Sequence, residues 1–327
     1  MSLNRIKPIG RLIKYLSGAL YDFNRFFKYG GWKINLKNKD ERNYYVVKIY
    51  HSLEKSMSFT NHNVNSGWTN AKLLTIALEA AVTYQNIGFH DKIGYLVLLE
   101  FLDKNKSAED TELKKYILNK INYISDAIRL KDNIEEYGVK NMSSEDLDGS
   151  SHIHPEFFFR SRNSVREFSK KEIPDTLLNK AIQLSLKTPS ACNRQSWHIY
   201  HLTNAYDIRN ALKYQSGNKG FSNRISNLLI ICSDLKAFNP GGERYQHWID
   251  GGMYAMSLIY SLHSMGISSC CLNWSCQAKQ DLQLRKEFPS ILKNHTIIMM
   301  LAIGYPENNN KICVSPRRPL HEIYTRL

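Results

Sequence analysis

Cysteine is absent from the first 191 residues of this 327-residue chain. The cysteines of the second half include an adjacent pair, and none are spaced as C-x-x-C. These spacings do not suit a zinc site, and we expect reduced thiols rather than disulfides. The six positions are Cys192, Cys232, Cys270, Cys271, Cys276 and Cys313.

Long apolar runs are absent as well. No window of 18 or more uninterrupted apolar residues occurs, so we expect no transmembrane helix. The basic leading segment, MSLNRIKPIGRLIKYLSGALYDFNRFF, has only short apolar stretches broken by charge, and it lacks the apolar core of a signal peptide. No repeat of fixed period or low-complexity stretch is present. These absences predict a soluble cytoplasmic protein, with peripheral membrane association as an added expectation.

The net charge of +14 is unevenly distributed. Residues 1–50 carry 11 Lys/Arg against 3 Asp/Glu, residues 51–150 carry 11 against 15, and residues 151–327 carry 22 against 12. Residues 1–32 combine basic and aromatic side chains, which suits an anionic membrane surface or an acidic partner. The alternative is a solvated basic face whose aromatics pack on the next helix. No nucleic-acid-binding module is recognisable, so we expect no nucleic-acid partner.

The chain has two halves with different patterns. Residues 1–140 predict a helical N-terminal domain with the basic aromatic segment in front, and one of its helices is expected to start at a Thr69/Asn70 cap. Another helix is expected over residues 110–138. Residues 141–156 are polar and predict a linker. From residue 157 to 327 helix and strand patterns alternate, which predicts an α+β or α/β layered domain. A long helix near residues 243–267 is apolar almost all round, so it belongs in a core or a subunit interface.

Three polar segments of the second half carry candidate chemistry. The stretch FFFRSRNSVREFS supplies Arg162, Ser164 and Arg166, and SPRRPL supplies Arg317 and Arg318. Arginine binds phosphate through two N–H groups at once, so the two clusters could converge on one phosphate; each alone could equally be a solvated basic patch. Between a helix and a strand, PSACNRQSW forms a polar loop that can present amides to a flat ligand with polar edges.

In this order the motifs resemble those of the nitroreductase family, the FMN-dependent α+β homodimers. The resemblance covers residues 155–327 and rests on R-N-S-V-R-E-F at 162–168, P-S-A-C-N-R-Q-S-W at 189–197, G-I-S-S-C-C-L-N-W at 266–274, and I-G-Y-P followed by P-R-R-P-L at 303–320. It implies a nitroreductase-like FMN-binding fold, a central mixed sheet flanked by helices, preceded here by an all-α domain. It also implies a homodimer in which both chains contact each flavin.

The resemblance assigns cofactor-binding roles position by position. It implies that the first motif holds the FMN phosphate and ribityl chain, that the loop lies along the isoalloxazine ring, that the backbone of the third motif reaches the flavin N5 region, and that one arginine of the fourth binds phosphate. No catalytic side chain is implied; Tyr245, His247 and His263 are candidates for a general acid by residue type alone. The implied cofactor-binding residues are Arg162, Asn163, Ser164, Arg166, Pro189, Ser190, Asn193, Gln195, Leu272, Asn273, Arg317 and Arg318.

Some positions depart from the family pattern. Ser196 stands where the family usually has proline, and Trp274 stands where a small residue is common. Cys192 is either a reactive thiol beside the ring or a small residue that fills space. H-S-L-E-K at 51–55 faintly resembles nitroreductase-like proteins with a helical extension that are associated with surface-polysaccharide biosynthesis. His51 and Glu54 are expected to make a polar contact on one helical face.

The resemblance predicts an FMN-dependent oxidoreductase that passes hydride from NADH or NADPH through FMN N5 to an unidentified small-molecule acceptor. A role in surface-polysaccharide metabolism is a further expectation. The alternative is a degenerate flavin-binding dimerisation scaffold whose helical half is the working module.

Overall fold

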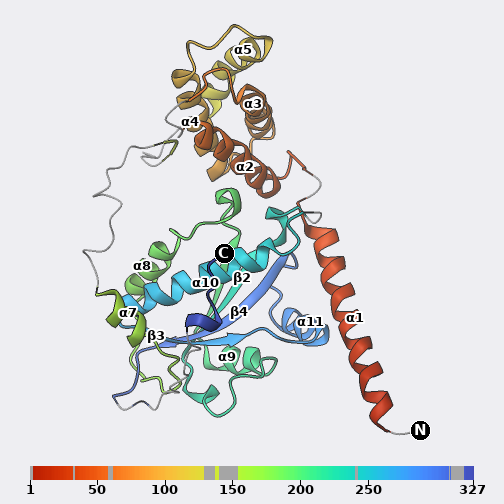
Figure 1. The fold of residues 1–327 in the computed structure, drawn as a ribbon, viewed down its shortest axis with the longest axis vertical. Coiled ribbons are helices and arrows are strands. Elements are labelled where there is room, and N and C mark those ends of the chain that lie inside the picture. The colour runs from red at the N-terminus through yellow and green to blue at the C-terminus, as the bar shows by residue number, and fades with distance from the viewer. Residues whose placement is uncertain are drawn as a thin grey trace.

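The computed structural model describes residues 3–31, 34–57, 62–128, 137–139, 154–239, 242–308, 310 and 320–327. Within these ranges, helices come first and strands are confined to the second half (Figure 1). The helices are α1 (Leu3–Tyr29), α2 (Lys39–Met57), α3 (Trp68–Thr83), α4 (Phe89–Lys104), α5 (Glu112–Ala127), α7 (Pro155–Ser161), α8 (Asp175–Ser185), α9 (Ala205–Leu212), α10 (Gln246–Ser264) and α11 (Ala278–Glu287). The strands are β1 (Trp197–Leu202), β2 (Asn227–Asp234), β3 (Ser268–Asn273) and β4 (His295–Gly304), and short 3-10 turns are η1 (Ala191–Asn193), η2 (Ser222–Arg224), η3 (Leu235–Ala237) and η4 (Leu320–Glu322).

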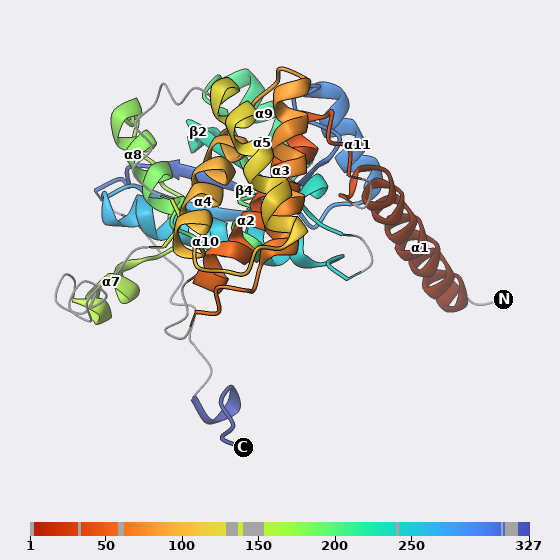
Figure 2. The ribbon, with the colours of Figure 1, turned by 90° about the horizontal axis from the view of Figure 1, so that it is seen from above.

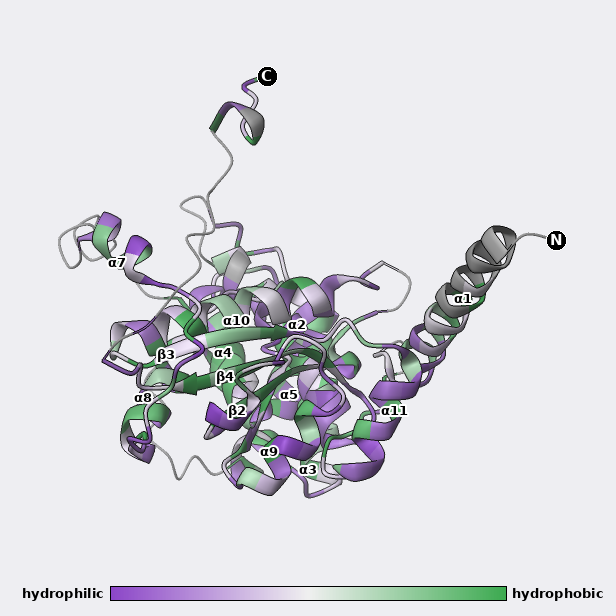
Figure 3. Cartoon of the chain, turned by 90° about the horizontal axis from the view of Figure 1, so that it is seen from below, coloured by the Kyte–Doolittle hydropathy of each residue, from purple (hydrophilic) through white to green (hydrophobic). Residues whose placement is uncertain are grey.

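The strands form one sheet in the order β1-β2-β4-β3, and each neighbouring pair is antiparallel. Strands β2 and β4 are central and carry long apolar runs, Leu228–Cys232 and Ile297–Ile303, which are green in Figure 3. Alternate residues of β2 pack on opposite faces of the sheet, because side chains along a strand point alternately to either side. Leu229 and Ile231 face one core, whereas Leu228 and Ile230 face the other.

Helices cover both faces of this sheet. Helices α8 and α10 pack on the face of Leu229 and Ile231, and α9 and α11 pack on the opposite face. Helix α10 lies close to β4 because Gly251 has no side chain; a Cβ there would lie 2.5 Å from Ile298 Cγ1. We call residues 154–308 the sheet unit.

Helices α2 to α5 pack on one another around a separate apolar core, and we call residues 39–128 the helical unit. Its centre is built from buried side chains such as Leu53, Leu74, Leu98 and Phe101. The unit lies beyond one end of the sheet, where α2 packs on η1 and η3 (Figures 1 and 2). Its first helix therefore contacts the segment that leads into β1.

Helix α1 packs on the sheet unit through α11 and η3. Tyr21 Oη donates a hydrogen bond to Asp281 Oδ2 (2.5 Å), and Phe26 is buried with Phe238. The N-terminal half of α1 projects away from the rest of the chain (Figures 1 and 2). Within the described residues, no helix is long and apolar enough to cross a membrane.

The α+β class with helices before the sheet is confirmed, with corrections to detail. A mixed sheet was expected, but the four strands are antiparallel, and the parallel pairing within the described ranges is a single bridge between Ser164 and Ser269. The helix expected to start at the Thr69/Asn70 cap begins at Trp68, after Gly67 in a left-handed conformation. The helix expected over 110–138 ends at Ala127. The expected linker lies outside the described residues up to residue 153, and α7 begins at Pro155.

Candidate functional site

Residues 162–168, which we call the basic segment, run beside the free edge of β3. The Val165 backbone N–H donates to the Ser269 carbonyl (3.1 Å), and Ser164 forms the parallel bridge with Ser269. Phe168 pairs with Pro306 just beyond β4 and packs against Gly304. These contacts fix the backbone, so the polar side chains of the segment are held at one end of the β3 edge.

Arg162 is half-buried, and among the described residues no carboxylate pairs with it. It lies close enough to Cys271 to act on that thiol, whose pKa burial raises and Arg162 lowers. Burial lowers the pKa of His263, and the positive charge of Arg162 lowers it further. His263 is hydrogen-bonded to Ser161 (2.8 Å). A half-buried guanidinium among a thiol and an imidazole is electrostatically suited to an anion.

The other end of the β3 edge carries Leu272 and Asn273. Leu272 is buried in the core, so its side chain cannot face a ligand, whereas Asn273 is exposed. Main-chain groups alternate in direction along an antiparallel strand. Since the Ser269 carbonyl points to the basic segment, the N–H groups of Cys271 and Asn273 point off the same free edge. The Asn273 carbonyl accepts from Gln215 Nε2 (3.0 Å).

Residues 189–196 form the polar loop, and it holds an unusual backbone. Cys192, Asn193 and Gln195 have φ values of 52°, 53° and 49°, in the left-handed region that costs free energy for most residues other than glycine. Ser190 Oγ accepts from the Gln195 N–H (3.0 Å), and the Ser190 carbonyl accepts from the Asn193 N–H (2.9 Å). The folded loop leaves Pro189 and Asn193 exposed.

Arg194 fixes the polar loop to the residues packed behind it. It is almost fully buried, at 2% exposure, and its guanidinium donates to both carboxylate oxygens of Glu243 (2.9 and 2.7 Å) and to the carbonyls of Ala191 and Ala237. The pKa of Glu243 is lowered because hydrogen bonds from Arg194 outweigh the opposing effect of burial. Asp250 of α10 accepts from the Ala191 N–H (3.1 Å). The strained loop is thus held by the buried Asp250 and the partly buried Glu243.

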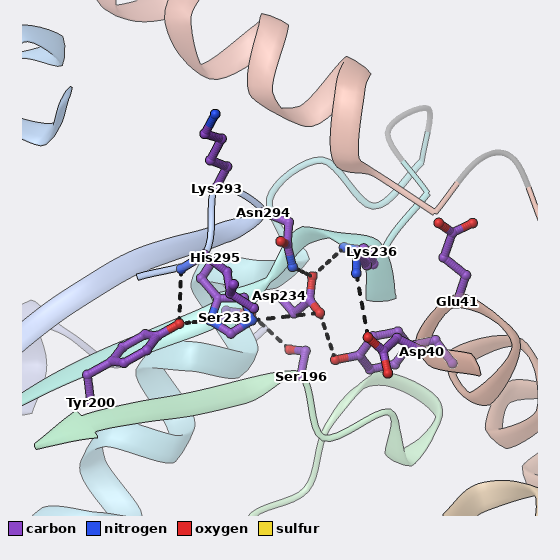
Figure 4. Close-up of polar contacts among 12 residues, drawn as sticks. Asp40, Glu41, Ser196, Tyr200, Ser233, Asp234, Lys236, Lys293, Asn294 and His295 are labelled. Carbon is purple, nitrogen blue, oxygen red and sulfur yellow. Dashed lines mark hydrogen bonds and ion pairs between the residues drawn. The ribbon is translucent and has the colours of Figure 1, made fainter. Parts of the chain in front are cut away.

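A buried polar network continues beneath the loop and reaches α2 (Figure 4). Ser196 Oγ contacts Ser233 Oγ (2.8 Å), and the Ser196 carbonyl accepts from the Asp234 N–H (2.7 Å). Asp234 accepts from Asn294 Nδ2 (2.7 Å) and from Tyr44 Oη of α2 (3.2 Å). Burial raises the pKa of this carboxyl, and the hydrogen bonds partly offset the rise. The helical unit is therefore hydrogen-bonded to the base of the polar loop.

His295 belongs to the same network. Its Nδ1 contacts Tyr200 Oη (2.8 Å), and its Nε2 lies 3.9 Å from Asp234 Oδ2. Burial lowers the pKa of His295 to about 3, so the imidazole is neutral and its contact with Asp234 is not an ion pair at neutral pH. These groups support the loop; none lies at the β3 edge.

The structure does not bring all predicted site residues together. The basic segment, Leu272 and Asn273 lie along β3, whereas the polar loop precedes β1 at the opposite edge of the sheet. Three strand spacings separate these edges, about 14 Å. Residues 162–166 and Asn273 therefore lie along one edge of the sheet, and residues 189–195 of the same chain lie beside the opposite edge. Arg317 and Arg318 lie outside the described residues.

The three general-acid candidates, Tyr245, His247 and His263, lie in different surroundings. His247 is buried against Phe26 and Phe238, and its pKa is lowered to about 4 by burial. His263 contacts Ser161 and the ring of Phe158. Tyr245 is exposed at the start of α10. Within the described part of the chain, no group of three His, Cys, Asp or Glu side chains is placed to hold a metal ion.

Sequence reasoning missed the residues that support the site. No role was predicted for Arg194. Its position in the middle of a short polar loop was a signal that its side chain could fix the loop to the rest of the protein. Trp274, which departs from the family pattern, donates from Nε1 to Asp281 Oδ1 (2.9 Å), the carboxylate that also accepts from Tyr21 of α1. Asp281 could not be found by pattern, because its partners come from three separate segments.

Two cavities adjoin these segments. One of 430 Å³ lies behind the polar loop, between α2 and the sheet unit, and is lined by residues that include Tyr45, Lys48, Arg194 and Glu243. A smaller one of 170 Å³ lies between α1 and the end of β3, where Trp274 and Trp248 contribute to its wall. None of the candidate residues at the β3 edge lines the second cavity, and Trp274, which follows Asn273 in the chain, is the wall residue nearest to them in sequence.

Comparison with known proteins matches the segment that carries these motifs. Residues 159–218 match the family model described as the nitroreductase family. A relative from Archaeoglobus fulgidus, provisionally named an NADH dehydrogenase/NAD(P)H nitroreductase, is 25% identical over 152 residues, which are 45% of this chain and 83% of the relative. A protein from Methanothermobacter thermautotrophicus with the same name is 19% identical over 151 residues, or 46% of this chain and 76% of that protein.

Solved structures are also similar to about half of the chain. An FMN-dependent nitroreductase from Clostridium difficile R20291 is 17% identical, with 52% of this chain and 98% of that chain covered and a TM-score of 0.44. A nitroreductase with bound FMN from Bacteroides fragilis is 18% identical, with 54% and 99% covered and a TM-score of 0.42. The matched family segment contains both the basic segment and the polar loop.

Proposed function

We propose that this chain, whose resemblance to the nitroreductase family is confirmed by the match over residues 159–218, is an FMN-dependent oxidoreductase with NADH or NADPH as electron donor. One observation carries the proposal: the free edge of β3 has anion-binding groups at one end and an outward-facing backbone N–H at the other. A flavin nucleotide has the complementary form, with a phosphate at one end and a ring with polar edges at the other.

The residues at this edge fit that cofactor. Arg162, Ser164 and Arg166 would hold the phosphate and ribityl chain, with Asn163 alongside. From Ser269 to Asn273 the strand advances about 14 Å, which suits an extended ribityl chain between phosphate and ring. Arg162 has no carboxylate partner among the described residues, so a bound phosphate would supply its missing counter-charge.

Bound FMN would supply the redox chemistry, and the protein positions and polarises it. The Asn273 N–H would donate to the ring edge, where its fixed direction favours the reduced, more negative form. Asp281 holds the Trp274 indole in place through a hydrogen bond, so this side chain bounds the pocket next to Asn273. The apolar surroundings of Leu272 keep the backbone at that point rigid.

The polar loop must then serve a flavin held by another copy of the chain. Pro189, Ser190, Asn193 and Gln195 lie at the opposite sheet edge, so we propose a homodimer in which each loop covers the ring bound by its partner. An exposed apolar side of α10 supports this arrangement, because such patches mark interfaces. Its residues are Trp248, Ile249, Met253 and Met256.

The test is the visible absorption spectrum of the purified protein before and after heat release of bound ligand. Flavin bands near ~450 nm, with the released compound identified as FMN, are expected. Addition of NADH or NADPH under anaerobic conditions should then bleach the bands. A protein that is colourless and takes up no FMN on reconstitution would remove the enzyme proposal, and would favour the scaffold whose helical half is the working module.

We add three more specific proposals, on the domain boundaries, the acceptor and the location. We place the domain boundaries at residues 140 and 156. On the H-S-L-E-K segment alone, in which His51 and Glu54 lie 3.6 Å apart, we extend the acceptor to a glycan-related compound of surface-polysaccharide metabolism. A cytoplasmic location with peripheral membrane contact through residues 1–32 is the third. A screen of sugar-nucleotide acceptors against the reduced enzyme tests the second.

A further inference from the structure

Helix α1 presents its apolar side to solvent and its polar side to the protein. Ile13, Leu16, Leu20 and Phe23 are exposed by 62%, 48%, 60% and 63% of their surface. They recur at intervals of three and four residues, so they share one side of the helix. We call these four residues the α1 stripe. An exposed stripe of this kind marks a surface that is covered in the working protein.

The contacts of the opposite side fix the direction of the α1 stripe. Tyr21 donates to Asp281, and the Arg25 guanidinium donates to the carbonyls of Lys293 (3.1 Å) and His295 (2.8 Å). Phe26 is 9% exposed and meets the edge of the His247 ring at 5.3 Å. Rotation of α1 to bury the stripe would break all of these contacts. The stripe therefore needs an occupant that approaches from outside.

Charge distinguishes between two such occupants. Residues 1–20 contain four basic residues and no acidic one. Two copies of α1 side by side would bring like charges together. The positions beside the stripe, where a coiled coil carries oppositely charged pairs, hold no charged residue. They are Gly10, Ser17 and Asn24 on one flank and Leu12, Ala19 and Phe26 on the other. A second α1 is thus a poor occupant, whereas an anionic surface complements the charge.

We propose that α1 docks on an anionic lipid bilayer, with its axis in the plane of the interface and the α1 stripe below the headgroups. Helices that bind in this way combine a basic polar side with Leu, Ile and Phe on the other. The Phe23 and Phe27 rings stack with centroids 6.0 Å apart, which extends the apolar surface at the end of the stripe nearest the sheet unit. The rest of the protein then lies on the aqueous side of α1, as its contacts require. This inference rests on the membrane contact proposed above for residues 1–32 and assigns it to one side of α1, and it does not depend on the proposed redox function.

The experiment is flotation of the full-length protein with vesicles of phosphatidylcholine alone and of phosphatidylcholine mixed with phosphatidylglycerol. Binding to the mixed vesicles is expected to exceed binding to the neutral ones by at least tenfold and to fall as salt is raised. The double variant Leu16→Ser/Leu20→Ser should lose at least tenfold in binding to the mixed vesicles. Equal binding to both vesicles, or none to either, would overturn the proposal.

A matched control is available. Leu118 of α5 and Leu184 of α8 are exposed by 45% and 54%, close to Leu16 and Leu20. The double variant Leu118→Ser/Leu184→Ser should bind the mixed vesicles like the parent protein. Equal loss in both double variants would show non-specific apolar adsorption and would overturn the role of α1. Light scattering without vesicles supplies the last arm: a fall in oligomeric mass in Leu16→Ser/Leu20→Ser would assign the stripe to a second copy instead.

Discussion

Arg42 of the helical unit and Arg162 of the sheet unit differ in how their charges are satisfied. In the helical unit, Arg42 and Asp91 are fully buried, pair at 2.9 Å, and have their remaining hydrogen-bonding groups satisfied by the Leu36 and Asn86 carbonyls and the Gly88 N–H. In the sheet unit, Arg162 is half-buried at a free strand edge and no described carboxylate pairs with it. A charge that the fold satisfies completely serves the fold, whereas a charge left facing an open edge is available to a ligand.

The largest expected effect is on the satisfied charge. Arg42→Ala leaves the Asp91 carboxylate buried without its partner, and we expect a loss of about 3–5 kcal/mol in the free energy of unfolding. Chemical denaturation followed by circular dichroism measures it. Lys106→Ala is the control, since Lys106 and Asp103 form an exposed pair, and it should change stability by less than about 1 kcal/mol. Similar losses in the two variants would contradict the distinction between satisfied and open charges.

The open charge should behave in the opposite way. Arg162→Ala is expected to weaken FMN binding by about 10- to 100-fold, because a charge-assisted hydrogen bond to phosphate is lost, while the melting temperature of the apoprotein stays unchanged. Fluorescence titration of FMN measures the affinity. Arg160→Ala, which removes an exposed arginine paired with Glu156, is the matched control and should bind FMN normally. Unfolding of Arg162→Ala without loss of FMN affinity would reverse the assignment.

A third prediction concerns pH and the helical unit. Burial and the neighbouring Glu100 raise the pKa of Glu54 to about 7, with the Gly138 backbone as a partly compensating donor. The folded state thus holds a proton that the unfolded state releases near the ordinary glutamate pKa. The resulting stability is present at low pH and is lost as pH rises through about 7.

We therefore expect the free energy of unfolding to fall by about 1–2 kcal/mol between pH 5 and pH 8, after allowance for solvent screening. Glu54→Gln should flatten this slope. Thermal melts across that pH range in parent and variant measure the difference. Two ionisable side chains lie near this pair: His51 is 3.6 Å from Glu54, and Lys104 is paired with Glu100. His51→Gln is therefore the control that shows whether the pH dependence of stability comes from His51 instead of Glu54. An unchanged slope in Glu54→Gln would contradict the assignment.

The smallest expected effect is at the junction of the two units. Tyr44→Phe removes the hydrogen bond from α2 to Asp234, which keeps its contacts with Asn294 and the Lys236 N–H, so we expect a loss of about 0.5–1.5 kcal/mol. Tyr45→Phe is the neighbouring control and should be neutral. Hydrogen exchange in the polar loop of both variants measures whether the network transmits the loss. Equal protection in both would show that the loop is stable without α2.

Apolar periodicity was sufficient to predict most elements of the sheet unit. The long apolar helix predicted near residues 243–267 is observed as α10, which spans Gln246–Ser264. Strands β2 and β4 each contain a long apolar run, which is consistent with the alternating helix and strand patterns predicted from residue 157 onward. Strand direction was not predictable in the same way. An apolar run suits a buried strand whether its neighbour is parallel or antiparallel, so the residues of β2 and β4 do not distinguish the two pairings. The resemblance implied a mixed sheet, and the structure has antiparallel strands.

Candidate site residues were proposed from the family resemblance, even where they lie far apart along the chain. Ser164 and Asn273 were identified and lie along one strand edge. Arg194 was not, because its role depends on Glu243, which lies 49 residues away along the chain. The direction of α1 was also beyond prediction. Its pattern shows two sides, and only the contacts of Tyr21 and Arg25 reveal which side faces the protein.

The position of the two motifs at opposite sheet edges has a genetic consequence. If each flavin takes its phosphate contacts from one subunit and its loop from the other, Arg162→Ala and Asn193→Ala each impair both sites of their own homodimer. Mixed within one dimer, they leave one site with both defects and one with neither. Co-expression of the two defective alleles should therefore restore up to half of the parental activity per mixed dimer. A site built from a single chain would give no such complementation.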